Sequence, residues 1–540
     1  MRAALRPLLC MPLLAAACYA PSPPGGSYRC GEEDACPSNL HCKCNQCVSD
    51  DRQAACSFRI SVDKSPLLVR EHAAFPITVD AFDETGGSAG GFTGEVSLSA
   101  SWGDVCVGAR DCLKAPKTVH LANGTGAAMV SLNRETIPPQ TAVLFADYAG
   151  RRGSSESARI NVAPTPFTRD LRPVVPRVSE TETFGPVDVH ASAAQVEHVD
   201  GQYRMYFHAL STVFANGSAI ALATSSDGIR FDPSSVKEVF HQPQPGNQNA
   251  ISNPSLLTLP SGERGIFYAL GDTVATKGLG TGQIGLALSP DGLAAFVDQG
   301  VLLHNTDCPF CDLAFQTGSV IADPFPELSG NGALGGWIGF FTGVATPPSG
   351  DIPTISIGRA ISNDGTHFTI DSDPLLTNAR QFLAGELLLL SPRVLLDGTV
   401  LKMWYSYAVL PPTTAMVLDP CAGALAQAGR IEIGYATSQD GYFWTRSPFR
   451  KPGVTTDMPG NPVLSTTLDP AAYDGGAVSL LASSVIPTDG VDPSNGIALY
   501  YTAFFQQTFS ANQKLKLGMQ GFLLGDGGCA SNGVGRATRP

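Results

Sequence analysis

The sequence predicts an all-β chain, most of which repeats one kind of small sheet. The phrase Ala-x-Ser-x-Asp-Gly occurs four times, and each copy lies between two strand-like runs. Charged residues make up only 15% of the 540 residues, while glycine (57) and proline (41) are abundant. This composition favours short strands joined by turns over long charged helices. The four copies of the phrase begin at Ala223, Ala287, Ala360 and Ala436.

The repeated unit occupies residues 167–525. Each unit has a first strand of small or polar residues, an aromatic strand, a third strand that ends in the Asp-Gly turn, and an aromatic residue that opens a last strand. Glycine tolerates positive φ in such a turn, and the aspartate side chain bonds back to the turn backbone. The last unit lacks the turn after its third strand, which is expected at 515–518. Five units of roughly 70 residues account for the segment and predict a five-bladed β-propeller. The aromatic strands are expected at 203–209, 265–269, 337–342, 401–407 and 497–503.

The N-terminus is typical of an export signal. Arg2 and Arg6 precede a short apolar core that ends in three alanines, and Cys18 follows directly. Residues 1–17 are therefore predicted to be a signal peptide. The alanines before Cys18 resemble the lipobox of bacterial lipoproteins, which implies lipidation of Cys18 and a membrane anchor; ordinary cleavage beside an unrelated cysteine is the alternative. The expected location is the outer membrane or periplasm, or the extracellular space.

A cysteine-rich segment follows a Pro- and Gly-rich tether at 18–27. Six cysteines lie within 28–56, and His41 beside Cys42 makes a metal site one interpretation. Disulfides that staple a segment too small for its own core are favoured in an exported protein. Their connectivity is left open among fifteen possibilities.

Residues 57–163 alternate apolar and polar positions over several short runs, which predicts a β-sandwich. The runs at 125–132 and 157–162 resemble those of bacterial immunoglobulin-like domains. That resemblance implies a spacer or adhesive module.

The remaining cysteines suggest three further disulfides. Cys106 and Cys112 would clip a loop of the sandwich, and Cys308 and Cys311 would pinch a loop of the propeller rather than act in redox chemistry. Cys421 and Cys529 pair by elimination, which would tie the fourth unit to a C-terminal tail at 526–540.

The five repeated units resemble the five-bladed propeller superfamily of arabinanases, β-xylosidases, invertases, levansucrases and mannoside phosphorylases. In these enzymes carboxylates on the first strands act as a pair across a glycosidic bond. At the position of the family's Asp-Pro motif this sequence departs from the pattern. The aligned residues are Ser192-Ala193, Asn253-Pro254, Thr317-Gly318, Ser391-Pro392 and Gly475-Gly476.

Acidic residues do occur near these positions. Asp188, Asp312, Glu386 and Asp474 lie close to the first strands and are the candidate catalytic residues; capping of turns at the channel mouth is the alternative for each. Asn253, His190 and Trp404 are the candidate substrate-binding residues. His208 could join the pocket, although a structural role is the alternative for both histidines, as a place in the core is for Trp404.

Two functions are consistent with these observations. The first is an exported, envelope-anchored propeller that binds or processes carbohydrate, including a divergent glycoside hydrolase. The second is a non-catalytic lipoprotein for surface adhesion or recognition. The net charge of −13 and the absence of a basic run disfavour nucleic-acid binding. A monomer without cofactor or metal is expected, with a cell-surface glycan as its partner.

Overall fold

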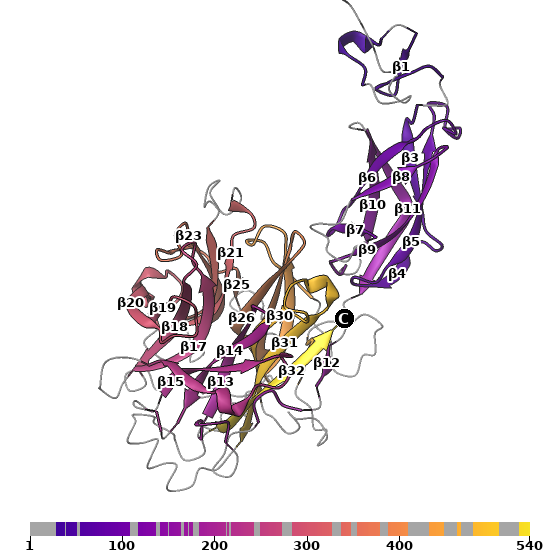
Figure 1. Cartoon of the computed structure of the whole chain (residues 1–540). Coiled ribbons are helices and arrows are strands. Elements are labelled where there is room, and N and C mark those ends of the chain that lie inside the picture. Colours follow the sequence, from indigo (N-terminus) through magenta and orange to yellow (C-terminus); the bar gives the residue numbers. More distant parts are fainter. Residues whose placement is uncertain are drawn as a thin grey trace, which may run out of the picture.

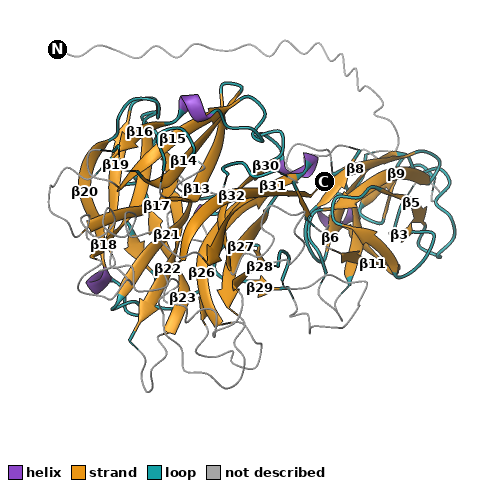
Figure 2. Cartoon of the chain, turned by 90° about the horizontal axis from the view of Figure 1, so that it is seen from below, coloured by secondary structure: helices purple, strands orange, loops and turns teal. Residues whose placement is uncertain are grey.

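The structure is a computed structural model of the whole chain. It describes residues 29–539 apart from 38, 51–53, 109–116, 137–140, 149–150, 164–166, 171, 177–182, 189, 212, 215–217, 242–248, 273–282, 327–335, 347–353, 378–386, 409–430, 448–461, 466–478 and 507–528. The described residues form strands and four short 3-10 turns, at Glu32–Asp34, Pro233–Ser235, Asn305–Asp307 and Pro493–Asn495 (Figure 2). The prediction of an all-β chain is confirmed. Nowhere in the described ranges is there a helix with the length and apolar character needed to cross a bilayer.

The cysteine-rich segment lies at the end of the sandwich that is farther from the repeated units (Figure 1). It holds one small hairpin, β1 (His41–Lys43) with β2 (Gln46–Val48). Its six cysteines form three disulfides, Cys30–Cys42, Cys36–Cys47 and Cys44–Cys56, which fix the connectivity that the sequence left open.

Two sheets pack face to face in the next part of the chain. Alternate residues of their strands point inward, as β5 shows with its regular alternation of buried and less buried positions, and the inward residues form one apolar core. One sheet has the order β4 (Leu67–Arg70), β11 (Arg151–Ala163), β10 (Ala142–Tyr148), β6 (Gly94–Ala100), β8 (Thr118–Leu121), and the other β3 (Ser57–Ser61), β5 (Phe75–Phe82), β9 (Thr125–Leu132), β7 (Val105–Val107).

The repeated units form a ring of antiparallel meanders. The strands of the first three units are β13 (His190–Val199), β14 (Gln202–Leu210), β15 (Ser218–Ser225), β16 (Lys237–Phe240); β17 (Asn249–Thr258), β18 (Arg264–Asp272), β19 (Gln283–Ser289), β20 (Val297–His304); and β21 (Ala314–Ala322), β22 (Trp337–Ala345), β23 (Thr354–Ser362), with β24 (Thr369–Ile370) and β25 (Leu376–Thr377) on β23. Those of the last two are β26 (Leu387–Asp397), β27 (Val400–Ala408), β28 (Ile431–Ser438), β29 (Thr445–Arg446); and β30 (Ser479–Pro487), β31 (Ile497–Gln506), β32 (Cys529–Arg539).

The first strands line the inside of the ring. β13, β17, β21, β26 and β30 contact one another in turn, and β30 contacts β13 to close the circle. Hydrogen bonds to side-chain hydroxyls join neighbouring units at equivalent positions. A backbone N–H of one unit donates to a hydroxyl of the preceding unit: Ser391 to Thr342, Ala482 to Ser406 and Ala193 to Thr502, each at 2.9 Å. Because equivalent positions are joined, these first strands run in the same direction.

The ring is closed by a strand from outside the repeat. β12 (Thr168–Arg169) pairs antiparallel with β32, so the last sheet takes its outer strand from the start of the ring segment. The sequence placed 526–540 in a tail, but the structure shows that Cys529–Arg539 is the third strand of the last unit. The expected strand at 515–518 lies outside the described residues.

The other cysteines are described in part. Cys308 and Cys311 form the expected disulfide, and Cys106 is disulfide-bonded. Cys18, Cys112 and Cys421 lie outside the described residues. Cys529 begins β32, and its pairing stays a prediction.

Candidate functional site

The candidate site is the end of the ring at which the first strands begin, which we call the mouth. Its strand starts are His190 in β13, Asn249 in β17, Ala314 in β21, Leu387 in β26 and Ser479 in β30. Since the units are meanders, β27 and β31 end at the mouth and β28 and β32 begin there, whereas the Asp-Gly turns lie at the other end.

Each first strand is interrupted shortly after the mouth. The strand register shifts there in all five units, as in a β-bulge. Ala193, Asn253 and Ser391 take the left-handed conformation at these points, with φ between 49° and 51°. The bulges fall where the sequence aligned the family's Asp-Pro motif, except in the last unit. There Gly475-Gly476 lies outside the described residues, and the shift falls at Ser483.

An arginine occupies the centre of the ring just below the bulges. Arg393 of β26 is 1% exposed, and its guanidinium donates to Gln195 Oε1 (3.1 Å), to the Gly318 carbonyl (2.6 Å) and to the Ala482 carbonyl (3.4 Å). It therefore links four of the five first strands. Burial lowers the pKa of Arg393 to about 10, so it stays charged at neutral pH. Within the described part of the chain, no carboxylate forms an ion pair with it.

A polar cluster lies between the mouth and this arginine. Ser192 Oγ is 2.7 Å from His190 Nε2 and 3.4 Å from His208 Nδ1, and His208 Nε2 is 3.3 Å from Ser218 Oγ. His208 and Ser192 are buried, and His190 is half-buried at the start of β13. The two imidazoles lie 5.3 Å apart, centre to centre. His190 and His208 are therefore neighbours near the start of β13, and their part in substrate binding stays a prediction.

Both histidines are neutral at physiological pH. Burial and then the neighbouring His208 lower the pKa of His190 to about 3, and burial lowers the pKa of His208 to about 4. A general base works best with a pKa near the working pH, so these imidazoles are weak candidates for proton abstraction from Ser192. They are suited instead to hydrogen bonds with neutral polar groups such as hydroxyls.

The predicted acids do not form a described pair. Asp188 is half-buried two residues before β13. Asp312 is exposed, and its carboxylate accepts the Thr346 hydroxyl (2.6 Å) and N–H (2.7 Å), which lowers its pKa. Glu386 and Asp474 lie outside the described residues. The Asp312 carboxylate is thus bound by Thr346 just beyond β22, and the catalytic roles of all four acids stay predictions.

Trp404 requires a correction. It is fully buried in the last two sheets, where its ring packs against Tyr435 and Phe167 and under the Arg539 guanidinium. A fully buried indole cannot offer a face to a sugar, so Trp404 is a core residue. Asn253 keeps its place on the first strand of the second unit, and its carbonyl accepts a hydrogen bond from the Thr317 hydroxyl.

Among the described residues, three groups of side chains have the spacing of metal ligands, and members of each are already bonded to other groups. Cys30, Cys36, Cys42 and Cys47 are held in disulfides, which argues for the staple at the cysteine-rich segment. Glu71, His72 and Asp397 come within 4.8 Å of one another, but the Lys402 ammonium bonds to both carboxylates and supplies the positive charge there. We assign no metal to any of the three groups.

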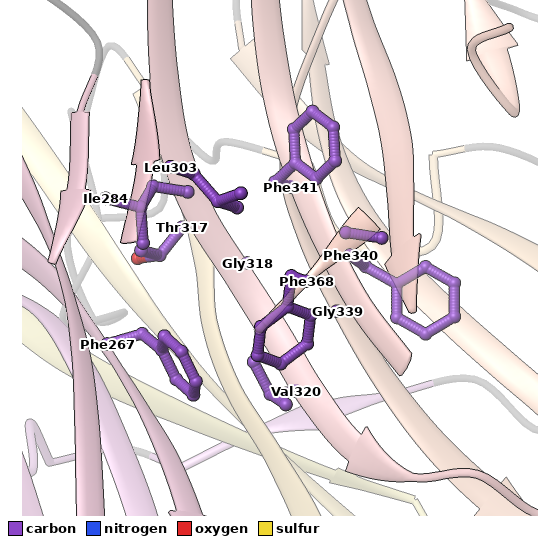
Figure 3. Close-up of a pocket in the computed structure, with 11 residues that line it drawn as sticks. Phe267, Ile284, Leu303, Thr317, Gly318, Val320, Gly339, Phe340, Phe341 and Phe368 are labelled. Atoms are coloured by element: carbon purple, nitrogen blue, oxygen red, sulfur yellow. The ribbon is translucent and has the colours of Figure 1, made fainter. Parts of the chain in front are cut away.

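A small cavity between the second and third units is apolar. Phe267, Ile284 and Phe368 line it together with backbone at Gly318 and Gly339, and its one polar side chain, Thr317, already donates to Asn253 (Figure 3). Such a lining offers a sugar no hydrogen-bond partners, so the mouth remains the better candidate.

Comparison with known proteins gives limited similarity. No protein-family model matches the sequence, and no curated protein is similar to it. Several similar solved structures are described as glycoside hydrolases. One from Bacteroides thetaiotaomicron, described as a putative glycosidase, is 12% identical with a TM-score of 0.41, covering 68% of this chain and 96% of its own. A family 117 glycoside hydrolase of Zobellia galactanivorans is 12% identical with a TM-score of 0.38, covering 69% and 90%. A thermostable family-43 enzyme is 14% identical with a TM-score of 0.39, covering 65% and 92%. At this level we take neither fold nor activity from the likeness.

Proposed function

We propose that this chain is an exported, envelope-anchored protein whose five-bladed propeller binds a neutral carbohydrate at the mouth without hydrolysing it. The supporting observation is the polar cluster of Ser192, His190 and His208, in which a hydroxyl is held between two neutral imidazoles. Sugars present rows of hydroxyl groups. A serine hydroxyl and neutral imidazoles bind these by donating and accepting hydrogen bonds. The immunoglobulin-like sandwich would serve as the spacer between the propeller and a lipid anchor at Cys18.

The first strands disfavour the paired-carboxylate mechanism. Serine, asparagine and glycine lie at the bulges, where the five-bladed propeller enzymes of the resemblance have acids. The positively charged guanidinium of Arg393 occupies the centre of the ring below them. An amide or hydroxyl cannot exchange a catalytic proton as a carboxyl does. The disulfides of the cysteine-rich segment support an oxidising compartment outside the cytoplasm.

Ser192 provides the test of this proposal. We expect Ser192→Ala to weaken retention on a plant or microbial glycan array about tenfold, the loss of roughly 1.4 kcal/mol of hydrogen bonding. Ser255→Ala is the matched control, because Ser255 is an equally buried serine of the next first strand whose hydroxyl has no hydrogen-bond partner. Its retention should equal that of the unaltered chain.

Two results would overturn the proposal. One is the absence of any glycan retention by the unaltered chain, which would favour an adhesion module for another partner. The other is turnover of aryl glycosides that is lost in Asp188→Asn or Glu386→Gln, since carboxylates would then perform hydrolysis at the mouth.

A further inference from the structure

The sandwich is joined to the ring by a specific polar interface. Its end near Asp104 and Asn133 meets the turn between β26 and β27, where Thr399 N–H donates to Asp104 Oδ2 (2.7 Å) and Asn133 Nδ2 donates to the Asp397 carbonyl (2.7 Å). This turn and the end of β32 lie at the end of the ring opposite the mouth. The interface is therefore separate from the candidate carbohydrate site.

A cluster of buried charges lies in this interface. Lys402 Nζ of β27 donates to Glu71 of the sandwich and to Asp397 Oδ2 (2.6 Å), and Arg539 Nη1 of β32 lies 3.1 Å from Glu71 Oε2. His72 Nε2 is 2.7 Å from Asp397 Oδ2. The side chains of Glu71, Asp397, Lys402 and Arg539 are at most 3% exposed. Two carboxylates and two cations thus neutralise each other where water is excluded.

A third carboxyl group in the same interface has no such compensation. Glu135 is 4% exposed, and among the described residues its Oε1 accepts only a long bond from the Ser447 hydroxyl (3.4 Å) and its Oε2 accepts none. The neighbouring Arg134 turns elsewhere, because its guanidinium stacks on Trp102 at 3.7 Å and bonds to Thr437. An unpaired buried carboxylate is costly, so the protonated form is favoured here.

Burial and one neighbouring charge favour the protonated form of Glu135. Burial, followed by the negative charge of Glu71, raises the pKa of Glu135 to about 7, although Lys402 and Arg539 oppose the shift. Glu71 and Asp397 keep lowered pKa values beside their cations, and burial raises the pKa of the adjoining Tyr435 hydroxyl. His72, Arg134 and Asp104 also lie at the interface, and hydrogen bonds from Thr399 outweigh burial and lower the pKa of Asp104.

We propose that Glu135 is a proton-operated latch: the sandwich docks firmly on the ring while Glu135 is protonated, and the docking loosens when Glu135 ionises. Because the pKa is higher in the docked state than the ordinary 4.5, the stabilisation is complete below about pH 4.5 and is lost as the pH rises through 7. Glu71 and Asp397 become protonated only below this pH range, because their pKa values are lowered. Release would let the propeller pivot on its spacer.

Hydrogen exchange of the full chain tests the latch. The Thr399 amide is protected by its bond across the interface, so its protection factor, corrected for intrinsic exchange, reports docking. A pKa shift of 2.5 units corresponds to roughly a 150-fold fall in protection between pH 4.5 and 8. Glu135→Gln, which mimics the protonated acid, should keep high protection throughout, and Glu95→Gln, at an exposed position of the same domain, should behave as the unaltered chain.

Sandwich-core amides such as that of Val79 should not follow this pH dependence, which separates undocking from unfolding. The latch is refuted if the protection of Thr399 in the unaltered chain does not change across this pH range. It is equally refuted if Glu135→Gln retains the full pH dependence. The first measurement needs no variant, so a folding failure of Glu135→Gln leaves the test intact.

Discussion

A single side chain organises the centre of the ring. Arg393 gives its N–H groups to the backbone or side-chain oxygens of three other units and has no carboxylate partner among the described residues. A guanidinium suits this role because its donors diverge in one plane and its charge persists when buried. One buried side chain therefore holds the first strands of four units together at the centre of the ring.

Replacing Arg393 should be costly. Arg393→Met removes the donors and leaves the Gly318 and Ala482 carbonyls buried without partners, at about 1–3 kcal/mol for each group. We expect the free energy of unfolding to fall by about 3 kcal/mol, partly offset because no charge remains to be desolvated. Urea denaturation followed by tryptophan fluorescence measures this. Arg230→Met, at an exposed turn, is the control, and equal stability of the two variants would contradict the role of Arg393.

The Asp-Gly turns act at the level of the element. In each copy the aspartate Oδ1 accepts two backbone N–H groups beyond the glycine, as Asp227 does from Ile229 and Arg230 at 2.8 Å each. The four glycines have φ between 67° and 77°, a conformation that favours glycine. Aromatic residues after the turns then pack on the preceding unit, as Trp444 does on Phe340. The motif therefore fixes turns and contacts between units and has no part in the mouth.

Two glycines of the first unit allow the cost of backbone strain to be compared with the cost of steric crowding. Gly201 and Gly228 both have positive φ, of 75° and 67°, but a Cβ at Gly201 meets open space whereas one at Gly228 would lie 2.8 Å from the Tyr203 ring. Gly201→Ala should cost about 1 kcal/mol from strain alone. Gly228→Ala should cost about 3 kcal/mol, since overpacking adds to the strain. Thermal unfolding of the two variants gives the difference, and equal costs would show that Tyr203 moves aside freely.

Sequence patterns predicted the elements that depend on local residues. Alternation, aromatic runs and the Asp-Gly phrase located the strands around 203–209, 337–342 and 401–407, because burial and turn chemistry act over a few residues. β12 and β32 were missed because neither has a strong local pattern: β12 is a two-residue strand that forms by pairing with β32, and β32 forms by pairing with β31. Their assignment needed contacts that no local pattern contains.

The residues of the candidate site were predictable from the sequence only in part. The positions that were aligned with the family's Asp-Pro motif coincide with the bulges at Ala193, Asn253 and Ser391, although the sequence predicted no bulge there. Arg393 and Lys402 were missed because charged residues in strands usually face solvent, and Trp404 was misjudged because an aromatic residue has the same pattern in a core as in a binding face. Alternation within Leu-Lys402-Met-Trp404 identifies a strand, but it does not tell which face meets another domain.

At the scale of the whole molecule, closure of the ring joins the two ends of the propeller segment. β12 pairs with β32, and Arg536 Nη1 reaches Asp170 Oδ2 at 2.7 Å across a sequence separation of 366 residues. β32 also carries Arg539 into the charge cluster with Glu71 of the sandwich. One strand therefore couples closure of the ring to docking of the sandwich. Late, long-range pairing of this kind is also the slow step expected for such a topology.

The closing ion pair should be worth more than an ordinary surface pair. The Arg536 and Asp170 side chains are 8% and 26% exposed, and Arg536 also packs on Tyr500, so its geometry is already restrained. In a double-mutant cycle with Arg536→Gln and Asp170→Asn, we expect a coupling energy of about 1–2 kcal/mol in urea unfolding. The exposed pair Lys43–Glu84, at 35% and 66%, should give about 0–0.5 kcal/mol in the same experiment. Equal coupling in the two cycles would mean that the β12 ladder alone, without this ion pair, holds the ring closed.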